Sequence, residues 1–138
     1  MRDYDEMGES MGLDEMNLDI TDYLILHELN NQEGRFNVAE EMRTWINEVT
    51  KLTCSAGVGP NKMLAKIGSD MNKPNGTFIV EFTEEKITDL MKDMSIWKIP
   101  GIGRVTEGVL NEIGIFTCQN AIDNAPLLIM AEYDYVIR

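Results

Sequence analysis

Residues 53–82 contain a helix pattern between two short strand patterns, which points to a packed layer of strands and helices. Small and β-branched residues at 53–58 predict a buried strand closed by glycines, and apolar residues at helical spacing predict a helix over 61–71. The Lys-Pro-Asn-Gly segment at 73–76 must end that helix, because proline keeps the residue before it out of the α region. Residues 77–82 then alternate as a second strand.

The segment before residue 53 adds one more strand pattern and one more helix pattern. Residues 13–20 alternate apolar and polar side chains from Asp14 onward, which predicts a half-buried strand. Residues 30–34 are rich in asparagine and glycine and predict a loop. From Val38 to Leu52 an apolar residue recurs every three or four positions, which predicts an amphipathic helix.

From Thr83 onward the chain carries helix patterns only. Thr83 is a predicted N-cap, and the two glutamates that follow it favour the positive end of the helix dipole. The predicted helical segments are 83–94, a short turn at 95–99, 104–113 ending at Gly114, and a weaker stretch from 120. The 138 residues allow one domain or two small ones, and we expect a boundary near 82, giving parts 1–82 and 83–138.

Charge and composition exclude several classes of protein. The net charge of −12 is uneven: residues 1–50 contribute −10, residues 51–110 contribute +1 and residues 111–138 contribute −3, so the middle of the chain can still meet phosphates. No apolar run is long enough to span a membrane, and the acidic N-terminus has no secretory signal pattern. Two distant cysteines, Cys54 and Cys118, exclude a disulfide scaffold and suit a reducing compartment.

The adjacent carboxylates of Asp14 and Glu15 are candidates for a metal site. Two such charges 4–5 Å apart would repel by roughly 3–4 kcal/mol at an effective dielectric near 20, unless a cation lies between them. Mg²⁺ prefers oxygen ligands and substrate phosphates, so it is the natural occupant. The alternative is that both residues simply belong to an acidic first third of the chain.

The Pro-Gly-Ile-Gly segment at 100–103 is a candidate phosphate-binding turn. A helical segment precedes it and another follows, so backbone N–H groups beside a helix N-terminus can meet an anion. Lys98 and Arg104 flank the turn, a pattern typical of the helix–hairpin–helix that contacts the DNA backbone. The alternative is a plain helical hairpin. The glycine-rich segment at 54–62 lacks the spacing of a P-loop.

Three segments in fixed order resemble the Y-family translesion DNA polymerases, and the DinB/kappa branch in particular. Residues 12–21 resemble the family motif S-x-D-E-A-Y-L-D-I/V-T, residues 53–76 match the next block almost position for position, and residues 99–106 resemble the hairpin of the thumb. The implied fold is of the α+β class: a partial palm sheet with packed helices over 1–82, then a small all-α thumb unit with a helix–hairpin–helix over 83–138.

The resemblance implies a role for each matching residue. Asp14 and Glu15 match catalytic carboxylates that hold Mg²⁺, and Lys73 matches the lysine that meets the incoming deoxynucleoside triphosphate. The residues expected to contact primer–template DNA are Lys98, Gly101, Ile102, Gly103 and Arg104, with Lys62 and Lys66 as further candidates. The implied activity is that of a DNA-directed DNA polymerase acting opposite damaged template in DNA repair. No membrane partner is implied, and the location would be nuclear in a eukaryote and cytoplasmic otherwise.

The chain also departs from the family pattern. The first metal motif of the family, D-x-D-x-F-F/Y, is absent, Gly12 replaces a serine, and Met16-Asn17 replaces Ala-Tyr. With two of three metal carboxylates we expect a two-metal site that is incomplete, and a fragment that does not extend a primer by itself. Two alternatives remain open: a non-catalytic helix–hairpin–helix module that binds DNA or regulates, and a degenerate product without function.

Overall fold

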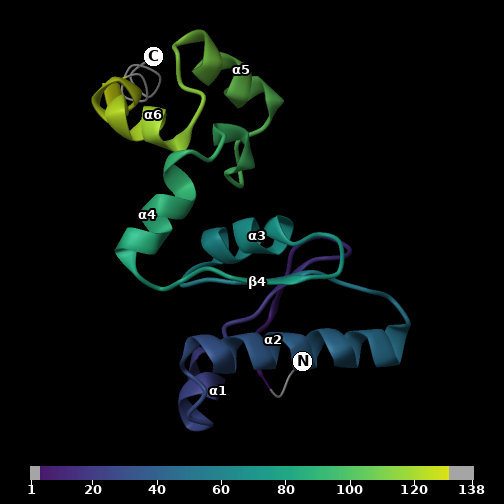
Figure 1. Cartoon of the computed structure of the whole chain (residues 1–138). Helices are drawn as coiled ribbons and strands as arrows, with labels where there is room; N and C mark the ends of the chain where they lie inside the picture. The colour runs from purple at the N-terminus through teal and green to yellow at the C-terminus, as the bar shows by residue number, and fades with distance from the viewer. Residues whose placement is uncertain (1–3, 131–138) are drawn as a thin grey trace. The chain divides into compact units, whose positions relative to one another are not determined.

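The structure is a computed structural model that describes residues 4–130. It consists of two compact units, residues 1–81 and residues 82–138, and each is described by itself (Figure 1). The elements of the first unit are β1 (Glu9–Ser10), β2 (Met16–Asn17), α1 (Thr21–Leu26), α2 (Gln32–Thr50), β3 (Ala56–Val58), α3 (Lys62–Met71) and β4 (Thr77–Ile79). Those of the second are α4 (Glu84–Lys92), the 3₁₀ turn η1 (Ile96–Lys98), α5 (Arg104–Glu112) and α6 (Cys118–Asp123).

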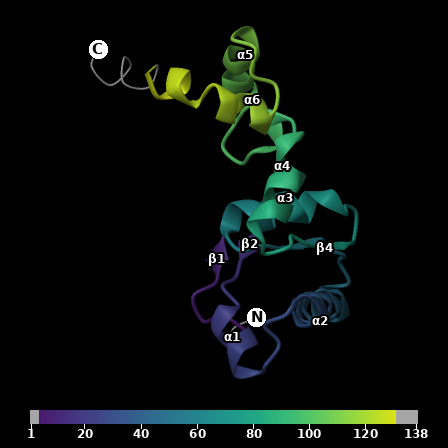
Figure 2. The same ribbon diagram turned by 60° about the vertical axis from the view of Figure 1, so that its left-hand side comes forward.

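The strand–helix–strand order predicted for residues 53–82 is present, with shorter strands. β3 and β4 form a parallel two-stranded sheet in which Gly57 is paired with Phe78. Figures 1 and 2 show α3 on one face of this sheet and α2 on the other. Leu64 and Ile67 of α3 are each only 3% exposed, and Val80 beyond β4 is 1% exposed. These residues are the core of the sandwiched layer.

The glycines of the 53–76 block let the backbone of β3 contact the backbone of α3 directly. A Cβ atom added to Gly57 would lie 2.0 Å from the carbonyl oxygen of Ala65, and one added to Gly59 would lie 2.7 Å from the nitrogen of Ala65. Real Cβ atoms essentially never come so close. The glycine-rich sequence therefore serves strand–helix packing.

The strand predicted over residues 13–20 is wrong for most of its length. Only Met16–Asn17 is strand, and it pairs antiparallel with β1, so that Ser10 is opposite Met16. Residues 11–15 form the hairpin turn between the two, closed by the bond from Met11 N to Glu15 O (2.8 Å), with Gly12 at a φ of +87°. The apolar and polar alternation thus spans a turn, a short strand and the approach to α1.

Helix α2 begins at Gln32, so the loop predicted for residues 30–34 is wrong beyond Asn31. The side chain of Asn31 accepts a hydrogen bond from Gly34 N at 2.9 Å and caps the helix. Val38 and Met42 are buried beside Leu24, as the predicted apolar stripe requires. The end of the stripe is not covered, since Leu52 is 68% exposed and lies beyond the helix.

The second unit follows its predicted pattern more closely. The Thr83 side chain accepts a bond from Lys86 N, which confirms the predicted cap of α4. Helix α5 ends at Glu112, one residue before the predicted end, and the chain turns at Gly114, whose φ is +82°, with Ile115 N bonded back to Leu110 O at 2.9 Å. Helix α6 begins at Cys118, earlier than predicted, because Thr117 and Asn120 form a capping box.

None of the helices in residues 4–130 is both long and apolar enough to cross a membrane.

Candidate functional site

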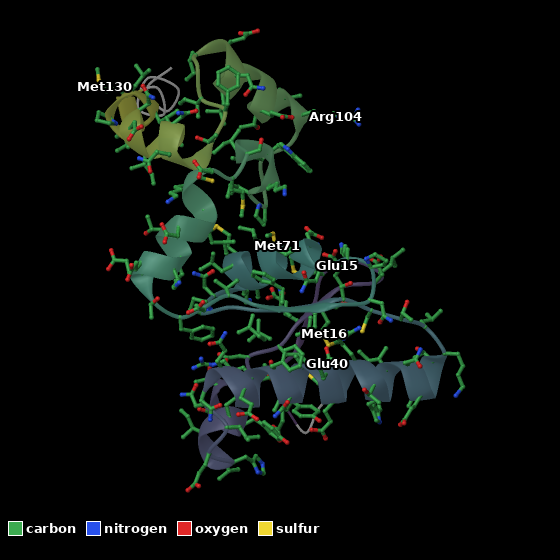
Figure 3. The ribbon with its side chains drawn as sticks, viewed as in Figure 1. Glu15, Met16, Glu40, Met71, Arg104 and Met130 are labelled. Carbon is green, nitrogen blue, oxygen red and sulfur yellow. The ribbon has the colours of Figure 1, made fainter. Side chains whose placement is uncertain are left out.

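Asp14 and Glu15 lie at the hairpin turn between β1 and β2, and both are exposed. The Glu15 carboxylate forms an ion pair with Lys66 of α3, and Glu9 of β1 pairs with Lys62 on the same helix. Glu15 is labelled beside α3 in Figure 3. Two lysines of α3 therefore contact the hairpin that carries the two predicted metal ligands.

Lys73 comes shortly after α3 and pairs with Asp70 of that helix. The hydrogen bond and charge of Asp70 raise the pKa of the Lys73 ammonium, and the charges of Glu15 and Asp14 add to this shift. A lysine with its ordinary pKa of 10.5 is already charged throughout the neutral range, and the raised pKa extends the charged state to more alkaline pH. The structure thus brings a permanent cation into the electrostatic field of both predicted metal ligands.

Asp14 and Glu15 supply two of the oxygen ligands that a divalent cation would need. Mg²⁺ is commonly held by one or two carboxylates together with water and substrate phosphates, and Asp14 and Glu15 supply the carboxylates. Within residues 4–130, no group of three or more histidine, cysteine, aspartate or glutamate side chains could hold a metal ion. The two carboxylates therefore fit a site that a phosphate ligand would have to complete.

Lys62 and Lys66 are both engaged with carboxylates of their own chain. The side chain of Lys62 is 72% exposed and that of Lys66 is 34% exposed. Exposed ion pairs of this kind contribute little free energy, so either lysine can exchange its partner at small cost. Their contact with DNA stays a prediction.

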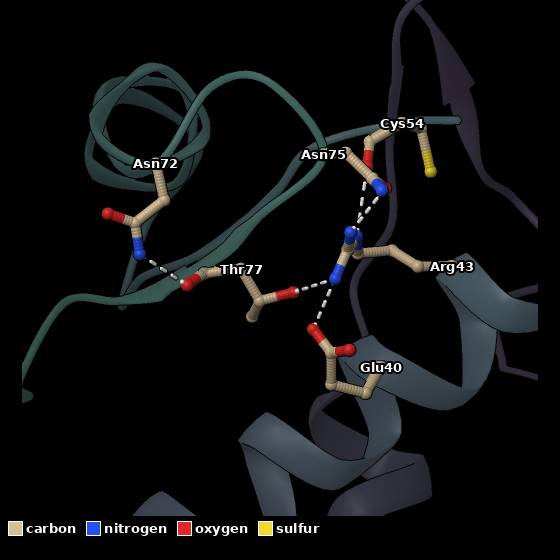
Figure 4. Close-up of polar contacts among 6 residues, drawn as sticks. All are labelled: Glu40, Arg43, Cys54, Asn72, Asn75 and Thr77. Carbon is tan, nitrogen blue, oxygen red and sulfur yellow. Dashed lines mark hydrogen bonds and ion pairs between the residues drawn. The ribbon is translucent and has the colours of Figure 1, made fainter.

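Arg43 is a polar centre that the sequence pattern did not single out. Its guanidinium donates to Cys54 O (2.9 Å), Asn75 Oδ1 (2.6 Å) and Thr77 Oγ1 (3.2 Å), and it pairs with Glu40 (Figure 4). Its side chain is 12% exposed. The only sign of this centre in the sequence is that Glu40 and Arg43 lie three residues apart on one helix face, which predicts their ion pair. Contacts to residues 32 and 34 positions away could not be read from that spacing.

The turn at 100–103 lies in the second unit, between η1 and α5. Ile102 N bonds to Ile99 O at 3.0 Å, Gly101 has a φ of +97°, and Gly103 is the N-cap residue of α5. A Cβ added to Gly101 or Gly103 would meet no atom within 4 Å, so the outer side of the turn is open. Ile102 is half-buried, whereas Lys98 and Arg104 are exposed.

The family of the chain follows from comparisons with known proteins. Residues 1–70 match the family model described as "impB/mucB/samB family". DNA polymerase IV of Shewanella frigidimarina is 44% identical over 115 residues, which are 83% of this chain and 30% of the relative. DNA polymerase kappa of Arabidopsis thaliana is 40% identical over 128 residues, which are 92% of this chain and 18% of the relative.

Solved structures that match the chain also include DNA polymerases. An insertion ternary complex of Dbh DNA polymerase matches with a TM-score of 0.77 and 33% identity, covering 88% of this chain and 34% of that one. DinB from Sulfolobus solfataricus matches with a TM-score of 0.76 and 33% identity over the same shares. The chain spans about a third or less of the length of these relatives. It belongs to the impB/mucB/samB family, whose members among its relatives are Y-family DNA polymerases of the DinB/kappa type, as its sequence motifs implied.

Proposed function

We propose that this chain forms part of the catalytic region of a translesion DNA polymerase, which adds deoxynucleotides to a primer 3′-hydroxyl opposite damaged template. The observation that carries the proposal is the position of Glu15 and Lys73 beside one helix: Glu15 pairs with Lys66 of α3, and Lys73 follows that helix and pairs with its Asp70. The family model matches residues 1–70, which include Asp14 and Glu15. On this proposal residues 1–82 are part of a palm and residues 83–138 are part of a thumb.

The proposed chemistry divides between the carboxylates and the lysine. Asp14 and Glu15 would hold Mg²⁺, which when bound offsets charge on phosphate oxygens and lowers the pKa of an attacking hydroxyl. Lys73 would bind the triphosphate as a compact positive charge. Glu15 would exchange Lys66 for the cation, an exchange that is inexpensive because the pair is exposed.

DNA contact is proposed for the turn at 100–103. Gly101 and Gly103 would let a phosphate approach the backbone near the N-terminus of α5, with Lys98 and Arg104 beside it. A helix–hairpin–helix contact of this kind is independent of base sequence, because it touches only the phosphate backbone. Lys62 and Lys66 remain further candidates for DNA contact. The location would be nuclear in a eukaryote and cytoplasmic otherwise.

The second candidate function is a non-catalytic module that binds DNA through this turn. The open outer side of Gly101 and Gly103 favours it independently of the carboxylates. Binding without nucleotide incorporation is its signature.

A chimera tests the proposal. The 115 matched residues of the Shewanella frigidimarina DNA polymerase IV would be replaced by the corresponding residues of this chain. We expect template-directed primer extension that falls by 100-fold or more with Asp14→Ala, since several kcal/mol of charge stabilisation are about this factor or larger. A folded chimera that binds primer–template DNA but extends no primer would favour the non-catalytic module.

A further inference from the structure

The turn that carries Lys73 is contacted from α2 by one half-buried arginine, Arg43. The turn covers residues 72–76, between the end of α3 and the start of β4. The Asn72 side chain closes it by donating to Thr77 O at 2.8 Å, and Asn75 adopts a left-handed φ of 54°. Figure 4 shows Arg43 of α2 reaching across to Asn75 and Thr77.

The four partners of Arg43 come from four different segments of the first unit. Cys54 O lies just before β3, Asn75 Oδ1 is in the turn, Thr77 Oγ1 is on β4, and Glu40 is on α2 itself. A planar guanidinium with several donors can satisfy such a set at once, and a lysine cannot. Thr77 is itself buried at 8% exposure, so these contacts are shielded from water on one side.

We infer that Arg43 is a positioning residue that fixes the 72–76 turn and so holds Lys73 ready to bind a triphosphate. The inference rests on the proposed function, because it assigns Arg43 a part in binding the same ligand. Arg43 is not assigned a contact with the ligand, because each of its three guanidinium nitrogens already donates to its own chain. Its effect is to raise the fraction of molecules in which the Lys73 backbone is already in place, and apparent affinity scales with that fraction.

Two variants and one control distinguish loss of the contact with the turn from loss of a positive charge and from loss of folding. Asn75→Gly removes the Oδ1 acceptor and leaves Arg43 with Cys54, Thr77 and Glu40; glycine also accepts the positive φ at this position. Arg43→Met removes all four contacts. The matched control is Arg35→Met, which removes the same charge from α2 at an arginine bonded to Asn30 instead.

The first readout is independent of any ligand. In the intact chain, backbone ¹⁵N order parameters at residues 73–76 should be near 0.85 and should fall toward about 0.6 in Arg43→Met and Asn75→Gly, but not in Arg35→Met. If Arg43→Met does not fold, Asn75→Gly still provides the refuting outcome, because glycine by itself can only loosen the turn. A turn that stays as rigid in Asn75→Gly as in the wild type would overturn the inference.

The second readout is affinity for inorganic tripolyphosphate with Mg²⁺, followed by titration, with Lys73→Met defining the share that depends on the lysine. Both turn variants should bind roughly three- to tenfold more weakly, and neither should weaken binding further when combined with Lys73→Met. Wild-type binding that does not depend on Lys73 would count against the proposed role of Lys73, while the order parameters would still decide the inference. Lys73-dependent binding that both variants leave unchanged would refute the inference alone.

Discussion

Replacing Gly57 by alanine should strongly destabilise the first unit, although the change adds only one methyl group. That methyl carbon would lie 2.0 Å from Ala65 O, 2.2 Å from Ser69 N and 2.7 Å from the carbonyl carbon of Gly68. All three atoms are backbone of α3, so no flexible side chain can move aside. The helix would have to withdraw by about 1.4 Å to restore an ordinary contact of 3.4 Å with Ala65 O.

The cost follows from what α3 buries. Leu64 and Ile67 are each 3% exposed, and a side chain of this size contributes about 1.5–3 kcal/mol when fully buried. Losing half of that burial at two positions costs about 1.5–3 kcal/mol, and the strain of overpacking adds about 1–3 kcal/mol. The expected loss is therefore about 2.5–6 kcal/mol, a large part of the stability of a small domain.

Tryptophan fluorescence can measure this loss in the first unit alone. The chain has two tryptophans, so a Trp97→Phe background leaves Trp45 of α2 as the sole reporter during urea unfolding. The matched control is Gly68→Ala, because its added Cβ would meet its nearest atoms at an ordinary 3.4 Å. Alanine in a helix should then be neutral or stabilise by up to about 1 kcal/mol. A Gly57→Ala variant within 0.5 kcal/mol of the wild type would refute the packing argument.

Three further predictions concern the second unit, acid stability and DNA. Gly114→Ala should destabilise the second unit by about 1–2 kcal/mol because the residue has a φ of +82°, as read by Trp97 fluorescence during urea unfolding. Hydrogen bonding from Thr77 and pairing with Arg43 lower the pKa of Glu40 below its ordinary 4.5. The Glu40 carboxylate therefore contributes its full stability above pH 4.5, and this contribution is lost as the pH falls through the lower pKa of the folded state. Glu40→Gln should therefore flatten the decline of the urea midpoint below pH 4.5, and an unchanged decline would contradict this. Gly103 has a φ of −92° and a ψ of 177°, which threonine accepts, so Gly103→Thr should weaken DNA binding by blocking phosphate approach while preserving the fold. Wild-type binding should show a log–log salt slope of only about −1 to −2, and a slope near −6 would exclude contact with one or two phosphates.

Local signals explain which elements could be predicted from the sequence. Thr83 and Gly114 act on neighbouring residues through a cap and a left-handed turn: α4 begins directly after Thr83, and α5 ends shortly before Gly114. The alternation at residues 13–20 predicts a strand where the structure has a hairpin turn, because β1 and β2 pair with each other and their hairpin contacts lysines about 50 residues away. Alternation within one short segment contains no information about such partners.

The residues of the candidate site were also predictable only in part. The motif residues Asp14, Glu15 and Lys73 could be named from the family pattern, but not their common surroundings. Arg43 was missed because its importance comes from bonds to Cys54, Asn75 and Thr77, which are 11, 32 and 34 residues away. An arginine on the polar face of an amphipathic helix is ordinarily a solvated residue, and only folding turns this one inward.

Helix α3 links the packing of the first unit to its candidate site. One side of the helix meets Gly57 and Gly59 at backbone distance, while its lysines reach Glu9 and Glu15 of the hairpin and its Asp70 pairs with Lys73. A displacement of α3 by about 1.4 Å would therefore move Lys66 and Lys73 relative to the carboxylates, since both depend on the same helix. Gly57→Ala molecules that remain folded should consequently bind Mg²⁺ and tripolyphosphate more weakly than the Gly68→Ala control. Equal affinity in the two folded variants would show that the site does not depend on the close approach of β3 to α3.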